Sequence, residues 1–145
     1  MEKRINIIDL EPDAYQAMLG LEKYLGKTTL DVLTKQLVKI RTAQINGCAY
    51  CIQMHTQEAR KSGESEQRIY ALSAWKESPL FTDKEKALLS LTDEITLISK
   101  NGLNRDCYEQ ALQALGENAL AQAIMLIITA NAWNRIAVAT AMRHE

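Results

Sequence analysis

Apolar residues recur along almost the whole chain at intervals of three and four positions, the period of an amphipathic helix. Only two prolines and six glycines interrupt the 145 residues, of which 47% are hydrophobic, enough to bury a sizeable core. We therefore expect an all-α fold without strands. The pattern predicts about six to seven helices in a single domain that spans residues 1–145.

Start and stop signals divide this pattern into separate helices. Pro12 suits a first helical turn and Gly26 ends the first helix, which is expected to bury Ala14, Met18, Leu21 and Leu25. Thr82 and Glu85 have the spacing of a capping box, and Asn104 is expected to cap a short helix. The expected helices cover approximately residues 12–25, 29–45, 48–63, 65–78, 82–101, 104–116 and 117–142.

The last expected helix is apolar on most sides, so a membrane span has to be considered. Gln122, Asn131, Asn134 and Arg135 interrupt it, and polar or charged side chains are costly in hydrocarbon unless they are paired. The same residues can be satisfied inside a protein core or a subunit interface. The sequence predicts a buried helix, and no contact with a membrane.

Charge and cysteine content restrict the partners and the compartment. The net charge is −1 with both signs scattered, so nucleic acid is not an expected partner. Acidic residues and Pro12 interrupt the N-terminus before any apolar run of signal-peptide length, and we expect a cytoplasmic protein. In a reducing compartment three cysteines are not a disulfide framework, so a close pair indicates catalysis or metal binding.

The segment Cys48-Ala-Tyr-Cys51, followed by His55, contains the candidate reactive residues. On a helix these positions share one face, and the Asn46-Gly47 break before them places both cysteines in the first turn, where the helix dipole favours a thiolate. His55 lies one turn beyond Cys51 and about two beyond Cys48. The spacing predicts Cys51 as the nucleophile and Cys48 as the resolving thiol.

With a peroxide, such a nucleophile becomes a sulfenic acid, and the second thiol condenses with it to a disulfide. A separate dithiol must then reduce the pair. Covalent haem attachment is excluded because Ile52, not histidine, follows the second cysteine, and thioredoxin-like chemistry expects a βαβ context. Two alternatives stay open. One is a zinc-binding module using Cys48, Cys51 and His55 with Cys107, His144 or water, and the other is a pair of inert structural cysteines.

Three stretches of the chain resemble the carboxymuconolactone decarboxylase / alkylhydroperoxidase (AhpD-like) family. They are LVKIRTAQINGCAYCIQMHTQEARKSGE, RIYALSAWKESPLFTDKEKALLSLTDEIT and NAWNRIAV. The CxxCxxxH motif after the INGC turn resembles the peroxidase-like branch. This resemblance implies an all-helical homotrimer or homohexamer with no bound cofactor, acting as a hydroperoxide reductase with an antioxidant role. It also implies an external lipoyl-type dithiol as reductant.

Transferred residue by residue, the resemblance implies that Cys51 is the peroxidatic cysteine, Cys48 the resolving cysteine and His55 the proton relay. Tyr50 matches the tyrosine often found between the two cysteines. The family also contains decarboxylases, so a non-redox reaction on a muconolactone-like acid is an alternative, and in that reaction the cysteines would be unused.

One position departs from the family pattern. The family usually has a glutamate twelve residues before the first cysteine, whereas this chain has Gln36, which can hold a water or orient a histidine but cannot relay a proton. Glu58, three residues after His55, could orient it, although an ordinary solvated charge is the commoner role of such a residue. Glu85 and Glu94 are weaker substitutes.

The remaining polar and aromatic residues have simpler interpretations. Trp75 and Trp133 are expected in the core or an interface, and Cys107 is expected to be a buried bystander. His144 lies in a tail that is expected to fray, so the sequence predicts no role for it. The last helix carries Asn131, Asn134 and Arg135 on one face, for which a polar network and a solvated side are equally compatible with the pattern.

Overall fold

The computed structural model describes residues 3–144, which fold into helices and contain no strand. The elements are α1 (Ile7–Leu10), α2 (Pro12–Leu25), α3 (Val32–Asn46), α4 (Ala49–Lys61), α5 (Glu66–Ala71), a 3-10 turn η1 (Leu72–Ala74), α6 (Asp83–Thr96), α7 (Ile98–Asn101), α8 (Arg105–Leu115) and α9 (Glu117–Ala139). The all-α prediction is confirmed. The described part holds more helices than expected because the short helices α1 and α7 precede α2 and follow α6 as separate turns.

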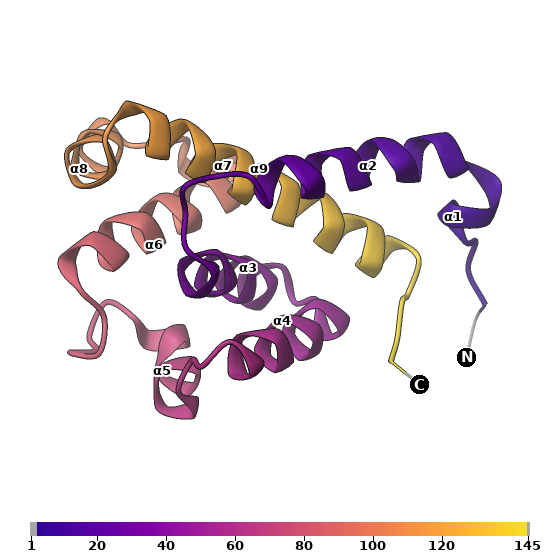
Figure 1. Ribbon diagram of the computed structural model, residues 1–145, viewed down its shortest axis with the longest axis horizontal. Coiled ribbons are helices and arrows are strands. Elements are labelled where there is room, and N and C mark those ends of the chain that lie inside the picture. The colour runs from indigo at the N-terminus through magenta and orange to yellow at the C-terminus, as the bar shows by residue number, and fades with distance from the viewer. Residues whose placement is uncertain (1–2, 145) are drawn as a thin grey trace.

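Helix α3 occupies the middle of the bundle, with α4 on one side and α6 and α9 on others (Figure 1). Asp31 caps it, accepting a hydrogen bond from the Thr34 N–H at 2.9 Å. Val38, Ile40 and Ala43 on α3 are fully buried, because neighbouring helices cover it on several sides. Helix α3 is therefore the element against which α4, α6 and α9 pack.

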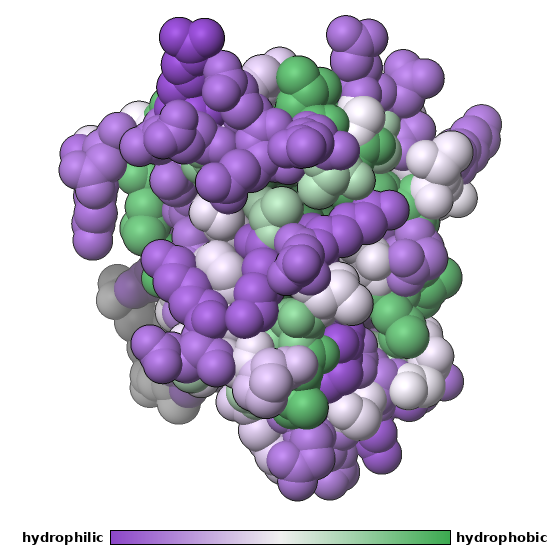
Figure 2. Space-filling model, turned by 90° about the vertical axis from the view of Figure 1, so that its left-hand side faces the viewer, coloured by the Kyte–Doolittle hydropathy of each residue, from purple (hydrophilic) through white to green (hydrophobic). Residues whose placement is uncertain are grey.

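Two main hydrophobic clusters pack around α3. The larger one joins it to α6, α8 and α9, and a second joins it to α4, α5, η1 and α6 through Trp75 and Phe81. Trp75 is buried, as expected, and its indole N–H donates to Asp93 at 3.1 Å. The end of the molecule that carries α5, α6 and α8 is largely hydrophilic, with apolar residues in separate patches (Figure 2).

Helix α2 differs from its predicted burial. Of the four residues expected inside, only Leu25 is buried, whereas Ala14 is exposed and Met18 and Leu21 are half-buried. The reason is that α2 lies along one side of α9, where Tyr15 meets the edge of Trp133 at a centroid distance of 5.8 Å (Figure 1). Its apolar stripe is therefore covered on one side only.

Helix α9 passes through the bundle, and its buried residues include Leu126, Ile127 and Asn134. Within residues 3–144 no single helix has the length and apolar character needed to cross a membrane. Helices α8 and α9 reach that standard only when taken together, and the chain bends by 120° between them.

The two ends of the chain lie at the same side of the molecule (Figure 1). The Arg4 guanidinium donates hydrogen bonds to the carbonyls of Val138 at 3.3 Å and Ala139 at 3.0 Å. A cation at the C-terminal end of a helix satisfies carbonyls that have no partner within the helix. This contact holds the segment before α1 against the C-terminal end of α9.

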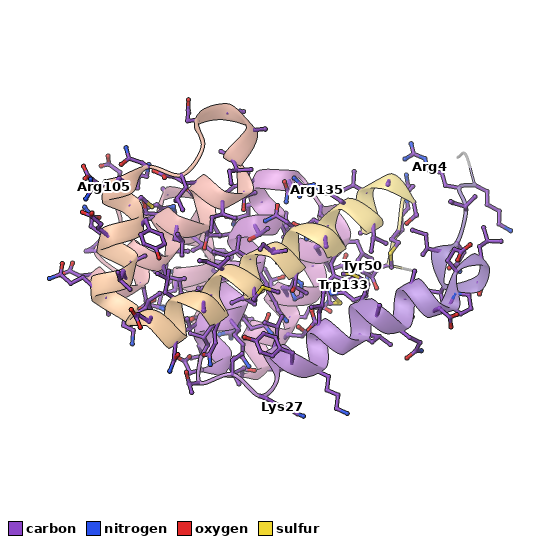
Figure 3. The ribbon with its side chains drawn as sticks, turned by 90° about the horizontal axis from the view of Figure 1, so that it is seen from above. Arg4, Lys27, Tyr50, Arg105, Trp133 and Arg135 are labelled. Atoms are coloured by element: carbon purple, nitrogen blue, oxygen red, sulfur yellow. A yellow bond between two sulfur atoms is a disulfide. The ribbon has the colours of Figure 1, made fainter. Side chains whose placement is uncertain are left out.

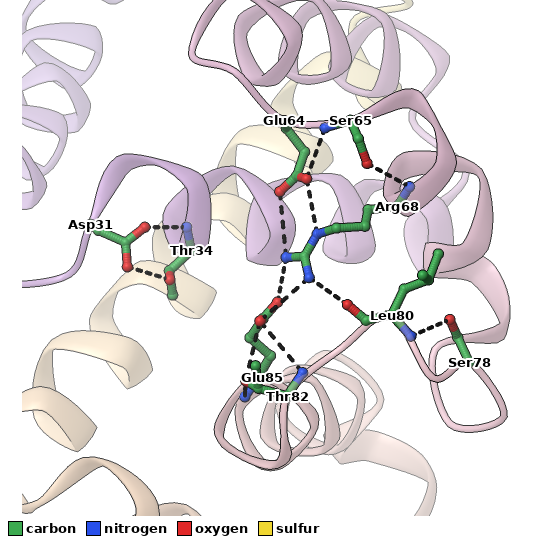
Figure 4. A network of polar contacts seen from close by, with 9 residues as sticks. All are labelled: Asp31, Thr34, Glu64, Ser65, Arg68, Ser78, Leu80, Thr82 and Glu85. Carbon is green, nitrogen blue, oxygen red and sulfur yellow. Dashed lines mark hydrogen bonds and ion pairs between the residues drawn. The ribbon is translucent and has the colours of Figure 1, made fainter.

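Two helix caps that the sequence predicts are present at the starts of α6 and α8. Thr82 and Glu85 form both bonds of the expected capping box, and Asn104 caps α8. Arg68 on α5 donates to Glu64 at 2.9 Å, to the Leu80 carbonyl and to Glu85, so α5 is tied to the start of α6 (Figure 4). Glu64 is only 3% exposed. Its charge depends on Arg68 for compensation.

We expect Arg68→Met to lower the free energy of unfolding by about 3 kcal/mol, because it leaves a buried carboxylate unpaired beside Glu85. The matched control is Arg105→Met, which removes an exposed pair with Glu109 and should cost less than ~0.5 kcal/mol. Chemical denaturation at pH 7 measures both. Equal losses in the two variants would show that the Arg68 network has no special structural role.

Candidate active site

A left-handed turn places the cysteine pair. Gly47 has φ 65° and ends α3, and this conformation strains any residue with a Cβ. The next residue, Cys48, is the N-cap of α4, and its Sγ accepts a hydrogen bond from the Cys51 N–H at 3.2 Å. The sulfur of Cys48 thus takes the capping position that a serine or aspartate oxygen commonly occupies.

The two cysteines are joined in a disulfide, with their Cα atoms 5.3 Å apart. Cys48 is 1% exposed and Cys51 2% exposed, and both pack against Ala43 of α3 and Ala137 of α9. The sulfurs therefore lie where three helices meet, shielded from bulk water.

His55 lies one helical turn after Cys51 and is buried, with 8% of its surface exposed. Its Nδ1 is 3.2 Å from Oε2 of Glu58, and the Gln36 side-chain amide donates to the same oxygen at 3.2 Å. The sequence favoured a solvated charge for Glu58. That interpretation was incomplete, because its half-exposed carboxylate joins Gln36 of α3 to His55 of α4.

The surroundings of His55 favour the neutral imidazole. Burial lowers the pKa of His55 below its usual range, and the charge of Lys39 lowers it further, while the hydrogen bond and charge of Glu58 act in the opposite direction. Because a carboxylate only accepts, the hydrogen on the neutral ring belongs on Nδ1. Nε2 is then left with a lone pair that can take a proton.

A polar network holds the turn before Cys48. The Asn46 side chain donates to Oδ1 of Asn131 at 3.0 Å and to Oδ1 of Asn134 at 3.1 Å. Arg135 also donates to Oδ1 of Asn131, at 2.7 Å. Of the two interpretations of this face of α9, the network is the one observed, and its effect is to fasten the Asn46-Gly47 turn to α9.

A pocket of about 440 Å³ opens beside the start of α4. It is lined by Gly47, Cys48, Ala49, Tyr50, Gln53, Ala137, Val138, Ala141, Met142, Arg143 and His144. Tyr50 stacks on His144 with ring centroids 4.2 Å apart, and Nε2 of His144 is 2.9 Å from the Tyr50 carbonyl oxygen. Tyr50 and Arg4 lie at the same end of the molecule as the end of α9 (Figure 3).

The position of His144 could not be found from the sequence. We expected the tail to fray, but His144 meets a residue 94 positions earlier in the chain. No local spacing signals such a contact. The structure thus adds the C-terminal segment 141–144 to the surroundings of the cysteine pair.

The third cysteine lies apart from this site. Cys107 on α8 is buried, as expected, and burial raises the pKa of its thiol. Among residues 3–144 no group of three or more histidine, cysteine or acidic side chains is arranged to hold a metal ion.

Comparison with known proteins gives consistent results. A family model described as the carboxymuconolactone decarboxylase family matches residues 12–94. The uncharacterized protein YdfG of Bacillus subtilis is 38% identical over 143 residues, covering 99% of this chain and 97% of YdfG. A shorter match, 28% identical over 67 residues, relates 46% of this chain to 37% of the uncharacterized protein YnjA of Escherichia coli.

Solved structures share the fold. A protein of unknown function from Agrobacterium tumefaciens, ATU0492, provisionally described as the antioxidant defence protein AhpD, superposes with a TM-score of 0.95 at 37% identity, over 99% of both chains. The debrominase Bmp8 superposes with a TM-score of 0.81 at 18% identity, over 95% of this chain and 74% of Bmp8. At that identity the second similarity concerns the fold alone.

The charged residues around His55 should shift the pKa of its imidazole, and substitutions can test this. Lys39→Met should raise the pKa of His55, because it removes a nearby positive charge, and Glu58→Gln should lower it, because it removes the carboxylate on Nδ1. NMR titration of the imidazole measures both shifts against the wild type. Identical titration curves in all three proteins would contradict the described surroundings.

Proposed function

Because the chain belongs to the carboxymuconolactone decarboxylase family and has an AhpD-like fold with a CxxC pair, we propose that it is a thiol-dependent hydroperoxide reductase. The observation that carries the proposal is the buried Cys48–Cys51 disulfide at the first turn of α4, one turn before a buried histidine. Such a pair has the geometry of a two-electron redox centre.

The cycle begins with both cysteines reduced. His55 takes the thiol proton of Cys51 on Nε2, and the resulting thiolate attacks the terminal oxygen of a hydroperoxide. The O–O bond breaks, Cys51 becomes a sulfenic acid, and the leaving alkoxide or hydroxide receives the proton from His55. The first helical turn favours the thiolate through its free backbone N–H groups.

The Cys48 thiol then attacks the sulfenic sulfur, water leaves, and the disulfide forms. The bond between Cys48 and Cys51 corresponds to the product of this step. A dithiol must restore the pair, delivering two electrons and becoming a disulfide itself. We propose a lipoyl-type dithiol for this role, and a reducing compartment such as the cytoplasm as the setting.

The Glu58 carboxylate takes the place in this relay that the family glutamate has elsewhere. Gln36 cannot exchange a proton at neutral pH, but its amide holds Glu58 in contact with His55. Glu58 keeps the Nδ1–H tautomer and stabilises the imidazolium formed when Nε2 takes a proton. The carboxylate thus comes from α4, while α3 supplies the residue that positions it.

Peroxide consumption with a dithiol reductant tests the proposal. Cys51→Ser should lower the rate by at least ~100-fold because the nucleophile is lost, and Cys48→Ser should turn over more slowly than the wild type, because the external dithiol must then reduce the Cys51 sulfenic acid directly. Cys107→Ser is the control and should match the wild type, since Cys107 lies outside the site. In the wild type, one equivalent of peroxide should remove two hydrogens from the peptide that holds Cys48 and Cys51. Full activity in Cys51→Ser would refute the proposal.

A second variant tests the relay. Glu58→Gln should lower peroxide turnover about tenfold, because the imidazolium loses its partner, and should also displace the pH profile of the rate. Glu109→Gln is a matched control, since its exposed carboxylate pairs only with Arg105 on α8 among the described residues. If Glu58→Gln keeps both the rate and the pH profile, the carboxylate takes no part.

A further inference from the structure

The pocket at the start of α4 reaches only one of the two cysteines. Cys48 is among its lining residues, whereas Cys51 is not. Exposure does not separate them, because both are nearly absent from the molecular surface. The pocket lining does separate them, because Cys48 forms part of the wall and Cys51 does not, so a molecule that fills the pocket lies against Cys48.

The chemistry of the lining restricts what can bind. Tyr50, Val138 and Met142 provide apolar surface, and Arg143 is the sole charged side chain among the residues that line the pocket. A volume of about 440 Å³ accommodates a small organic molecule. These properties suit a slender aliphatic chain that carries a thiol, because a cation favours the ionised thiolate as it approaches.

We propose that this pocket binds the reductant, an aliphatic dithiol, and that its thiolate attacks Sγ of Cys48; the inference rests on the proposed redox function of the pair. The first thiolate forms a bond to Cys48, the Cys48–Cys51 bond breaks, and the electron pair leaves on Cys51. The second thiol of the reductant then attacks its own bonded sulfur, releasing Cys48 as a thiolate and a cyclic disulfide as product. Two electrons pass to the protein.

The structure can stabilise each of the two sulfurs as it leaves. Cys51 departs as a thiolate in the first turn of α4, which is the form that the next peroxide needs. Cys48 departs in the second step, when its Sγ can keep the hydrogen bond from the Cys51 N–H. Attack on Cys51 would instead leave the nucleophile occupied by the reductant.

Blocking the pocket tests its role. Val138→Trp places a large ring in the lining at a position 48% exposed, and Ile128→Trp is the control on the same helix, 45% exposed and outside the pocket. Oxidised protein is mixed with dihydrolipoamide, the free thiols are alkylated at intervals, and mass spectrometry follows loss of the disulfide. Val138→Trp should slow reduction about tenfold or more. Ile128→Trp should stay within about twofold of the wild type.

The attacked sulfur is found with a monothiol, which cannot complete the second step. Oxidised wild-type protein is incubated with 2-mercaptoethanol and excess iodoacetamide, and tandem mass spectrometry locates both modifications. We expect the mercaptoethanol adduct on Cys48 and carbamidomethylation on Cys51. An adduct on Cys51, or equal rates for the two tryptophan variants, overturns the inference. Neither readout uses peroxide, so failure here is separate from failure of the peroxidase function.

Discussion

The turn at Asn46-Gly47 is the constraint on which the site depends. Gly47 adopts a left-handed backbone, and an added Cβ there would meet open space, so the restriction is conformational and not steric. The Asn46 side chain fastens the turn to α9 through two asparagines. Because the turn ends α3 and starts α4 at once, it determines that Cys48 caps α4 and that Cys51 and His55 follow on its inner side.

Helix α3 contributes to the site although it carries no reactive group. Ala43 is small and fully buried, which lets the disulfide pack against the helix, and Gln36, about two turns earlier, reaches Glu58. Helix α3 thus contacts both the start of α4, which carries the disulfide, and the later turn of α4, which carries His55 and Glu58. The same packing removes water from His55, and this burial lowers the pKa of its imidazole.

Features set by neighbours in the chain could be predicted from the sequence. The helical period, the capping box at Thr82 and the closeness of Cys48 to Cys51 depend on spacing, and the structure has them. Features set by distant contacts could not be predicted. The stacking of His144 on Tyr50 is one example, and the exposed side of α2 is another, because it depends on which helices cover α2. Glu58 is an intermediate case. Its spacing from His55 allows a contact between the two side chains, but the hydrogen bond from Gln36 that holds the carboxylate there could not be predicted.

The position of Cys107 bears on whether unwanted disulfides can form in this protein. It is buried on α8 and packs in the cluster that joins α6, α8 and α9, whereas the redox pair belongs to the cluster between α3, α4 and α9. Burial raises the pKa of its thiol, which disfavours the reactive thiolate, and Cys107 packs in a different cluster from the other two sulfurs. Its burial and separate packing therefore oppose cross-linking to the redox pair during repeated oxidation and reduction, even though the chain has an odd number of cysteines.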